Sequence, residues 1–111
     1  MYYKDIVQGQ LGWVSLNPTK GHEQGGKRPV LILSNNEFNR RNGGMIKVAP
    51  ITTNMKEFPL HVKLPDGLPI KGKVLLEHER AIDLTARKFE PEGKVSNSFL
   101  NKVIKIVKMT Y

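Results

Sequence analysis

The apolar runs of this 111-residue chain are short, and clusters of turn-forming residues separate them. One of the longest runs is Val30-Leu31-Ile32-Leu33. Turn signals stand at Gly25-Gly26, Asn42-Gly43-Gly44 and Pro65-Asp66-Gly67. Short apolar or β-branched runs bounded by Gly, Pro, Asn and Asp are typical of β-strands. The chain is therefore expected to fold mainly as short strands joined by tight connections.

The positions of these runs predict a small, mainly β fold. Strands are expected over residues 12–16, 29–34, 45–51, 59–64 and 71–79, with a short one at 87–89 and a further extended stretch at 93–95. Short strands at close spacing favour an antiparallel sheet that curls on itself. A chain of this length has room for one compact domain, expected to span residues 1–111, with a modest core.

Two helices are expected beside the sheet. A short one over 35–41 begins with asparagines, which can cap free backbone N–H groups. A second begins near Ser96 and runs to about Lys108, with its apolar residues at helical spacing. A basic amphipathic helix can lie on a membrane surface. A lid over the barrel core, with its lysines in solvent, is the preferred interpretation.

Charge and the absence of cysteine narrow the function classes. Lys and Arg number 18 against 10 Asp and Glu, which gives a net charge of +8 and a pI near 9.9. Such a balance suits a polyanionic ligand such as nucleic acid, an anionic membrane or an acidic protein, or only a soluble basic surface. Without cysteine there is no disulfide, thiolate zinc site or Cys nucleophile. The sequence also lacks a membrane-spanning or signal-like apolar segment, so a cytoplasmic location is expected.

The densest polar segment covers residues 17–29, between two expected strands. Its ionisable residues are Lys20, His22, Glu23, Lys27 and Arg28. Its glycines let the backbone bend. Arg28 directly precedes Pro29, which restricts it to extended backbone, so its guanidinium is expected to project from the start of a strand. The plain alternative is a solvated hairpin loop with incidental charges.

Two further clusters carry polar groups that suit chemistry. Thr52 and Thr53 end an apolar strand, although threonine is also ordinary in strands. In residues 75–80, an extended backbone would place Glu77 and Glu79 on one face, where they could act as acid and base or hold a metal. Because no other carboxylate or histidine cluster has ligand spacing, no metal site is expected, and a simple ion pair remains open for Glu79.

In this order the clusters resemble the MazF/PemK (Kid-like) family of toxin endoribonucleases. The carrying segments are residues 12–14, 17–26, 28–34, 38–40, 50–53 and 75–83. The resemblance covers nearly the whole chain and implies a twisted, SH3-like antiparallel barrel with a C-terminal helix and a short internal helix. It also implies a homodimer with single-stranded RNA in a groove along its interface. A cognate antitoxin would cover that groove with an acidic, initially disordered tail, and operator DNA would bind only to the toxin–antitoxin complex.

The resemblance implies RNA cleavage without a metal or other cofactor. The ribose 2′-OH attacks the adjacent phosphorus, leaving 2′,3′-cyclic phosphate and 5′-OH ends. This reaction needs a base, positive charge for the developing phosphorane and a proton for the leaving oxygen. Arg28 matches the family's loop arginine and is assigned charge stabilisation, with proton delivery as an option. Thr52 matches the strand-end threonine whose hydroxyl contacts the phosphate.

The resemblance leaves the base open, because branches of the family differ. His22 and Glu23 match loop positions of separate branches, and Glu77 matches the acid assigned as base in the Kid-like branch. That branch has an arginine two residues before the acid, where this chain has Leu75, which puts more weight on Arg28. The further expected RNA contacts are Lys20, Lys27, Thr53, Lys56, Phe58 and Arg80. The cations would position phosphates, and Phe58 would either stack on a base or belong to the core or its rim.

The predicted function is a sequence-selective endoribonuclease, an mRNA interferase that stops translation and growth. The alternative is a non-enzymatic protein on the same barrel. It would be either a toxin of the gyrase-targeting type or a plain nucleic-acid binder with steep salt dependence. The segment 22–26 followed by Arg28 favours the enzyme.

Overall fold

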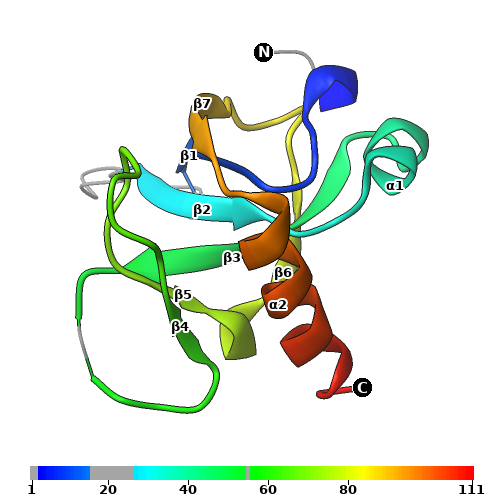
Figure 1. The fold of residues 1–111 in the computed structure, drawn as a ribbon. Helices are drawn as coiled ribbons and strands as arrows, with labels where there is room; N and C mark the ends of the chain where they lie inside the picture. The colour runs from blue at the N-terminus through cyan, green and yellow to red at the C-terminus, as the bar shows by residue number, and fades with distance from the viewer. Residues whose placement is uncertain (1–2, 16–26, 55) are drawn as a thin grey trace.

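The computed structural model describes residues 3–15, 27–54 and 56–111 (Figure 1). The strands are β1 (Gln10–Val14), β2 (Arg28–Ile32), β3 (Met45–Thr52), β4 (His61–Lys63), β5 (Lys73–Leu75), β6 (Arg80–Asp83) and β7 (Glu90–Lys94). The helices are α1 (Asn36–Arg41) and α2 (Asn97–Lys108), with 3-10 turns η1 (Tyr3–Asp5) and η2 (Leu76–His78). Within the described ranges the strands follow the order β4-β5-β3-β2-β1-β7, with β6 on β3, and pair antiparallel. The expected mainly β fold with two helices is confirmed.

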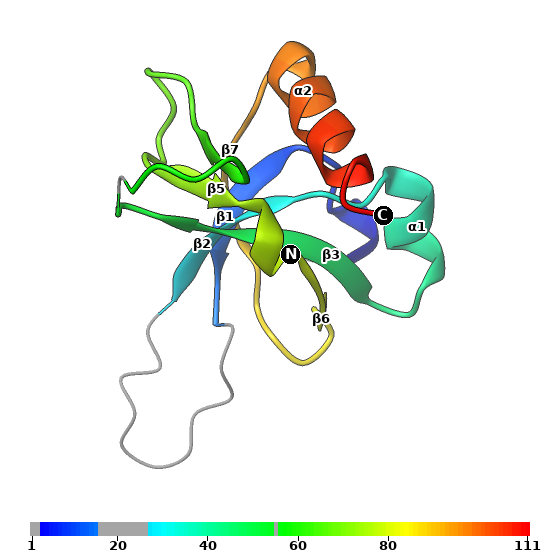
Figure 2. The same cartoon turned by 90° about the horizontal axis from the view of Figure 1, so that it is seen from below.

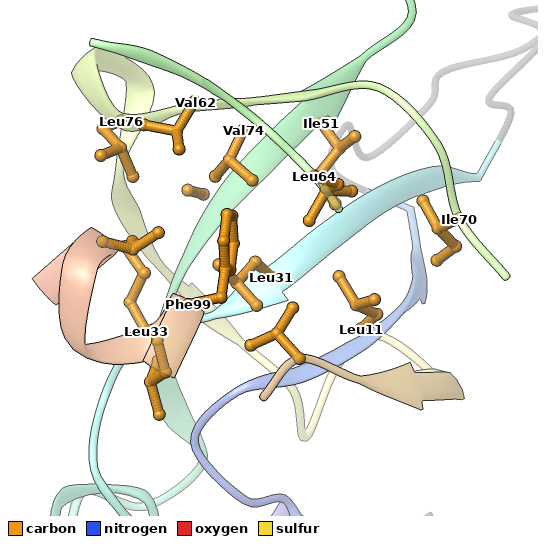
Figure 3. Packing of buried hydrophobic residues seen from close by; sticks show 14 residues of the cluster. Leu11, Leu31, Leu33, Ile51, Val62, Leu64, Ile70, Val74, Leu76 and Phe99 are labelled. Carbon is orange, nitrogen blue, oxygen red and sulfur yellow. The ribbon is translucent and has the colours of Figure 1, made fainter. Parts of the chain in front are cut away.

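Alternation along the strands places apolar residues on both faces of the sheet. One face contributes Leu11, Leu31, Ala49, Ile51, Val62 and Val74 to a cluster that α2 covers. Phe99 of α2 points into the middle of this cluster (Figure 3). The other face contributes Val14, Val30, Ile32, Ile46, Val48 and Ile82 to a second cluster, closed by Ile6 and Phe89. Figure 2 shows α2 and β6 on opposite sides of β3, as two apolar faces require.

Helix α2 is the lid that its sequence predicts. The Ser96 hydroxyl accepts a hydrogen bond from the Phe99 backbone N–H at 3.1 Å, which caps the first turn. Phe99, Leu100 and Val103 are buried, so the apolar stripe packs on the sheet. No helix of the described ranges is long and apolar enough to cross a bilayer.

The short helix α1 also begins where its sequence predicts. The Asn35 side chain accepts a hydrogen bond from the Phe38 backbone N–H at 2.8 Å. Asn39 is fully buried and bonds to the Ser34 hydroxyl and to the Ser34 carbonyl at 3.1 Å. This contact fixes the connection from β2 to β3 and hence the register of both strands.

The prediction of one strand over 71–79 is wrong. Strand β5 ends at Leu75, and Leu76–His78 form η2. The chain turns here because β5 pairs with β4 and β3, whereas β6 must return along the other end of β3. Glu77 and Glu79 therefore do not share one face of a strand.

Other boundaries also differ from expectation. The predicted strand at 87–89 is absent from the described chain. Phe89 is buried in the core, and strand pairing starts only at Glu90, in β7. Strand β6 was not predicted. Strand β4 is shorter than 59–64, since residues 59–60 form a turn. The first two strands start earlier and end earlier than expected, although residue 16 lies outside the described residues.

Candidate functional site

A hollow of about 480 Å³ opens where β2 begins and β3 ends. Its walls include Trp13, Lys27, Arg28, Thr52, Thr53 and Lys71. The strand register produces this gathering. Val30 stands opposite Pro50 in the antiparallel pair of β2 and β3. Two residues further along each strand, the same register places Arg28 opposite Thr52. Arg28, Lys27, Thr52 and Thr53, all predicted from the sequence, thus line one hollow.

Arg28 presents an unpaired cation at this hollow. Its residue is exposed, and among the described residues its guanidinium forms no ion pair or side-chain hydrogen bond. Pro29 follows in β2, so the start of the strand is restricted as predicted. A guanidinium fork without a carboxylate partner is available to the oxygens of a phosphate.

Thr52 offers a hydroxyl whose acceptor side is already used. Its Oγ1 accepts a hydrogen bond from the Asn54 backbone N–H at 3.1 Å, which leaves the O–H free to donate. Gly72 approaches the same residue closely: a Cβ at Gly72 would lie 2.3 Å from the Thr52 carbonyl oxygen. With φ at +132°, only glycine fits this position well, and it lets the loop with Lys71 approach the end of β3.

Two carboxylates of β7 contact residues that line the hollow. Glu90 forms an ion pair with Lys27, and the hydrogen bond from that ammonium lowers the pKa of the Glu90 carboxyl. The indole N–H of Trp13 donates to Glu92 Oε1 at 2.6 Å. Sequence reasoning missed both carboxylates, because their role depends on pairing between β1 and β7, which are far apart along the chain.

Glu77 lies outside this hollow, in a second group that we call the Glu77 cluster: Glu77, His61 and Phe58. His61 Nε2 lies 2.6 Å from Glu77 Oε2, and the rings of Phe58 and His61 have centroids 5.0 Å apart. Phe58 is exposed and belongs to neither apolar core. Sequence reasoning missed His61, whose only signal is the β4–β5 register that places it opposite Leu75.

The segment of residues 56–60 leads into β4, which carries His61 of the Glu77 cluster (Figure 1). Beneath it lies Lys73, whose side chain is only 5% exposed. The Lys73 ammonium donates to the Lys56 carbonyl at 3.1 Å and to Glu57 Oε2 at 3.2 Å. Lys73 therefore holds the segment against β5, and the Lys56 side chain remains exposed.

The remaining predicted residues are not gathered at the hollow. Lys20, His22 and Glu23 lie outside the described residues. Arg80 is exposed in β6, opposite Val48, and does not line the hollow. In the described ranges, His, Asp and Glu nowhere form a group of three that could hold a metal ion.

Comparisons with known proteins agree with this architecture. The family model "PemK-like, MazF-like toxin of type II toxin-antitoxin system" matches residues 7–110. The endoribonuclease toxin MazF of Escherichia coli (strain K12) is 38% identical over 88 residues, covering 79% of this chain and 78% of that protein. Endoribonuclease MazF9 of Mycobacterium tuberculosis is 33% identical over 110 residues, covering 92% of each.

Solved structures show the same fold. A crystal structure of MazE-MazF (Form-III) from Deinococcus radiodurans aligns with a TM-score of 0.85 and 30% identity, covering 98% of this chain and 96% of that chain. The MazF (Form-I) structure from that organism aligns with a TM-score of 0.80 and 33% identity, covering 95% and 94%. The resemblance inferred from the sequence is confirmed. This chain belongs to the PemK-like, MazF-like family of toxins of type II toxin–antitoxin systems.

Proposed function

We propose that this endoribonuclease toxin cleaves single-stranded mRNA without a metal ion and thereby stops translation and growth. The observation that supports the proposal most is that Arg28, which has no ionic partner among the described residues, lines the same hollow as Thr52, whose hydroxyl can donate. Both groups donate hydrogen bonds, and a phosphodiester offers only acceptors there.

The chemistry assigned to this pair is stabilisation of a phosphorane. The O2′–P bond forms and the P–O5′ bond breaks, so negative charge grows on the non-bridging oxygens. Arg28 donates two hydrogen bonds to those oxygens and can pass a proton to the departing 5′-oxygen. Thr52 donates a third. The strongest preorganised donors of this kind contribute about 10²–10³-fold to the rate.

The walls of the hollow suit an unpaired nucleotide. Trp13, Pro29 and Ile51 supply apolar surface for a base, and Lys27 and Lys71 supply charge for neighbouring phosphates. Sequence-tolerant binding of single strands combines these two features. Trp13 is half-buried, and its N–H is held by Glu92, so the indole ring has a fixed position.

Three residues are candidates for the base that takes the 2′-OH proton. His22 and Glu23 belong to the segment between β1 and β2, and Glu77 lies in η2 and does not line the hollow. A carboxylate or an imidazole is chemically suitable in each case.

Cleavage in the presence of a chelator is the direct test. The purified protein is incubated with single-stranded RNA in excess EDTA, and the ends of the fragments are analysed. We expect discrete fragments with 2′,3′-cyclic phosphate and 5′-OH ends, because no step requires a divalent cation. Loss of cleavage in EDTA with recovery in Mg²⁺ would contradict the mechanism. Intact RNA under every condition would favour a non-enzymatic binder.

We further propose a homodimer that an antitoxin with an acidic segment inhibits by covering the hollow. The net charge of +8 and the MazE-MazF complexes of relatives support this assignment. RNA and the acidic segment would then compete for Arg28, and operator DNA would bind only to the complex. Light scattering of the purified protein measures the dimer. Gel-shift assays with and without the co-expressed antitoxin test DNA binding, and shifted DNA with the toxin alone would contradict this part.

A further inference from the structure

The hollow lies at one edge of the sheet, and the row of strand ends that forms this edge continues beyond it. Strand β2 begins at Arg28, and β3 ends at Thr52. Lys73, the first residue of β5, stands opposite Thr52 on one side and Lys63, the last residue of β4, on the other. Neighbouring strands lie about 4.8 Å apart, so the backbone of Lys63 is about 14 Å from that of Arg28, three strands away. We call this row of strand ends the basic edge.

The connection between β4 and β5, residues 64–72, is anchored at the basic edge. Leu64 and Ile70 are buried, and both belong to the cluster that α2 covers (Figure 3). The Leu64 N–H donates to the Gly72 carbonyl at 2.9 Å, which closes the connection at its base. Its backbone therefore holds Lys71, which stands between Ile70 and Gly72, in a defined place.

A second hollow, of about 280 Å³, opens against this connection. Its walls include Lys63, Asp66, Lys71 and Gly72. Lys71 also lines the first hollow, so the two hollows are adjacent. Lys63 and Lys71 are exposed, and in the described part of the chain neither side chain forms an ion pair or a hydrogen bond. Both ammonium groups are therefore available to a ligand.

The charge of the second hollow suits a phosphate chain. Among the described residues that line it, Asp66 is the one acid, against two lysines. Within the described chain, Asp66 is exposed and forms no ion pair with either lysine. Ammonium groups that no carboxylate neutralises attract phosphates, and each contact releases a counterion from the nucleic acid. The second hollow thus extends the positive charge of the first one along the basic edge.

We propose that the second hollow is a binding subsite for the RNA strand on one side of the cleavage point. This inference rests on the proposed function. Lys71 contacts the phosphate next to the scissile one, and Lys63 contacts a phosphate further along the same strand. Contacts of this kind position the strand without reading its sequence. Because Lys63 stands about 14 Å from Arg28, it acts only on substrates that extend beyond the first hollow.

Binding of uncleavable strands separates this subsite from catalysis. The cleavage sites are first mapped, and labelled RNAs are made with a 2′-deoxy nucleotide at the mapped site, which removes the attacking hydroxyl. One RNA extends on both sides of the site, and two shorter ones are cut back on one side or the other. Fluorescence anisotropy gives Kd for the unmodified protein, for Lys63→Gln and for the control Lys102→Gln. Lys102 is an exposed lysine of α2 and lines neither hollow.

The expected result is a loss of affinity that depends on the length of the strand. Lys63→Gln should weaken binding of the long RNA about three- to tenfold at low salt, because one phosphate contact is lost. The loss should shrink for one of the two shorter RNAs, which identifies the side that the subsite holds. The slope of log K against log salt should become shallower by about 0.7, the value for one contact on a single strand. Lys102→Gln should keep the slope of the unmodified protein.

Asp66→Asn should act in the opposite direction. Removal of the negative charge from the second hollow should tighten binding of the long RNA about two- to threefold, with the same dependence on length. In steady-state cleavage, Lys63→Gln and Asp66→Asn should change KM with kcat little altered, since flanking contacts are equal in the ground and transition states. Thermal melting of each variant reports whether it is folded.

Three outcomes would overturn the proposal. Equal losses of affinity on long and short RNAs, or in Lys63→Gln and Lys102→Gln, would show that the overall field of the protein is at work. Unchanged RNA binding in Lys63→Gln, with weaker binding of a poly-glutamate peptide, would assign the second hollow to an acidic protein. If the unmodified protein cuts no RNA, the proposed function fails. The same comparison with unmodified RNAs of the two lengths then decides whether the subsite exists.

Discussion

The hollow and the Glu77 cluster differ in whether their charged groups have partners. At the hollow, Arg28 is exposed and has no acidic partner among the described residues, whereas Glu77 is held by a half-buried imidazole. A cation that binds a phosphate must stay open to its ligand, and a partner carboxylate would compete with that ligand. A base gains more from a fixed orientation than from exposure. The difference is between an exposed cation that is open to a ligand and a carboxylate that its neighbour holds in one orientation.

Lys73 connects the hollow and the Glu77 cluster through its neighbours. It stands opposite Thr52 on one side and Lys63 on the other, so it belongs to the row of residues that ends at the hollow. Its ammonium reaches the Lys56 carbonyl, the same oxygen that faces His61 Nδ1. One buried cation therefore holds the segment of residues 56–60, which carries Phe58.

The largest effect expected at the hollow is that of Arg28→Ala. Loss of the guanidinium should lower kcat/KM by at least about 10²-fold, since the developing charge loses its main donors. Arg28→Lys should recover only part of the rate, because an ammonium cannot donate in the bidentate geometry. The measurement is cleavage of a panel of single-stranded RNAs.

The control for Arg28→Ala is Arg41→Ala. Arg41 pairs with Glu37 on α1, away from the hollow, so its removal costs the same charge without touching the site. Equal losses in the two variants would show that net charge, and not the position of Arg28, governs cleavage. Full activity of Arg28→Ala would remove the hollow from the mechanism.

A smaller effect is expected for Thr52→Val. The variant loses the hydroxyl that donates to the phosphate, and it should lower kcat/KM about tenfold, or about 1.4 kcal/mol, near the lower range for a hydrogen bond to a charged group. Thr52→Ser keeps both the donor and the acceptor for the Asn54 N–H and should retain most activity. Similar rates for Val and Ser would argue that Thr52 serves only to end β3.

The sequence predicts the hollow better than the cluster for a physical reason. Arg28 before Pro29 and Thr52 after an apolar run are signals local to one strand each, and strand ends tend to meet at one edge of an antiparallel pair. The His61–Glu77 contact depends instead on where β5 stops. No Gly or Pro after Gly72 marks the end of a strand within residues 71–79, but the return to β3 requires the 3-10 turn at Leu76. Tertiary pairing here overrides local propensity.

The same reasoning explains which partners were missed on β7. An extended stretch at 93–95 was expected. It pairs with β1, however, and most of the chain lies between the two strands in the sequence. Glu90 and Glu92 contact Lys27 and Trp13 only through that pairing. The residue pattern of β7 alone does not predict its pairing with β1. The extended backbone of Arg28, in contrast, follows from the proline that comes next in the sequence.

The smallest effect is expected for Glu90→Gln, which tests Lys27, the lysine at the hollow that is paired with Glu90. The pKa of Glu90 is lowered by the hydrogen bond from Lys27, so the carboxylate is charged near neutral pH. Its contribution to stability is present above the unfolded-state pKa and is lost as pH falls through the lowered value. Glu90→Gln imposes the uncharged state at neutral pH and frees Lys27. RNA affinity should rise about two- to threefold, with a salt dependence steeper by roughly one phosphate contact.

The matched control for that variant is Glu37→Gln, which adds the same net charge on α1, where Glu37 pairs with Arg40 and Arg41. Salt titrations of RNA binding by both variants should differ, because only a cation released at the hollow can replace a counterion on the bound strand. Equal changes would mean that Lys27 acts through the overall field of the protein. In that case Arg28 would owe its importance to being unpaired, and not to a shared phosphate-binding surface with Lys27.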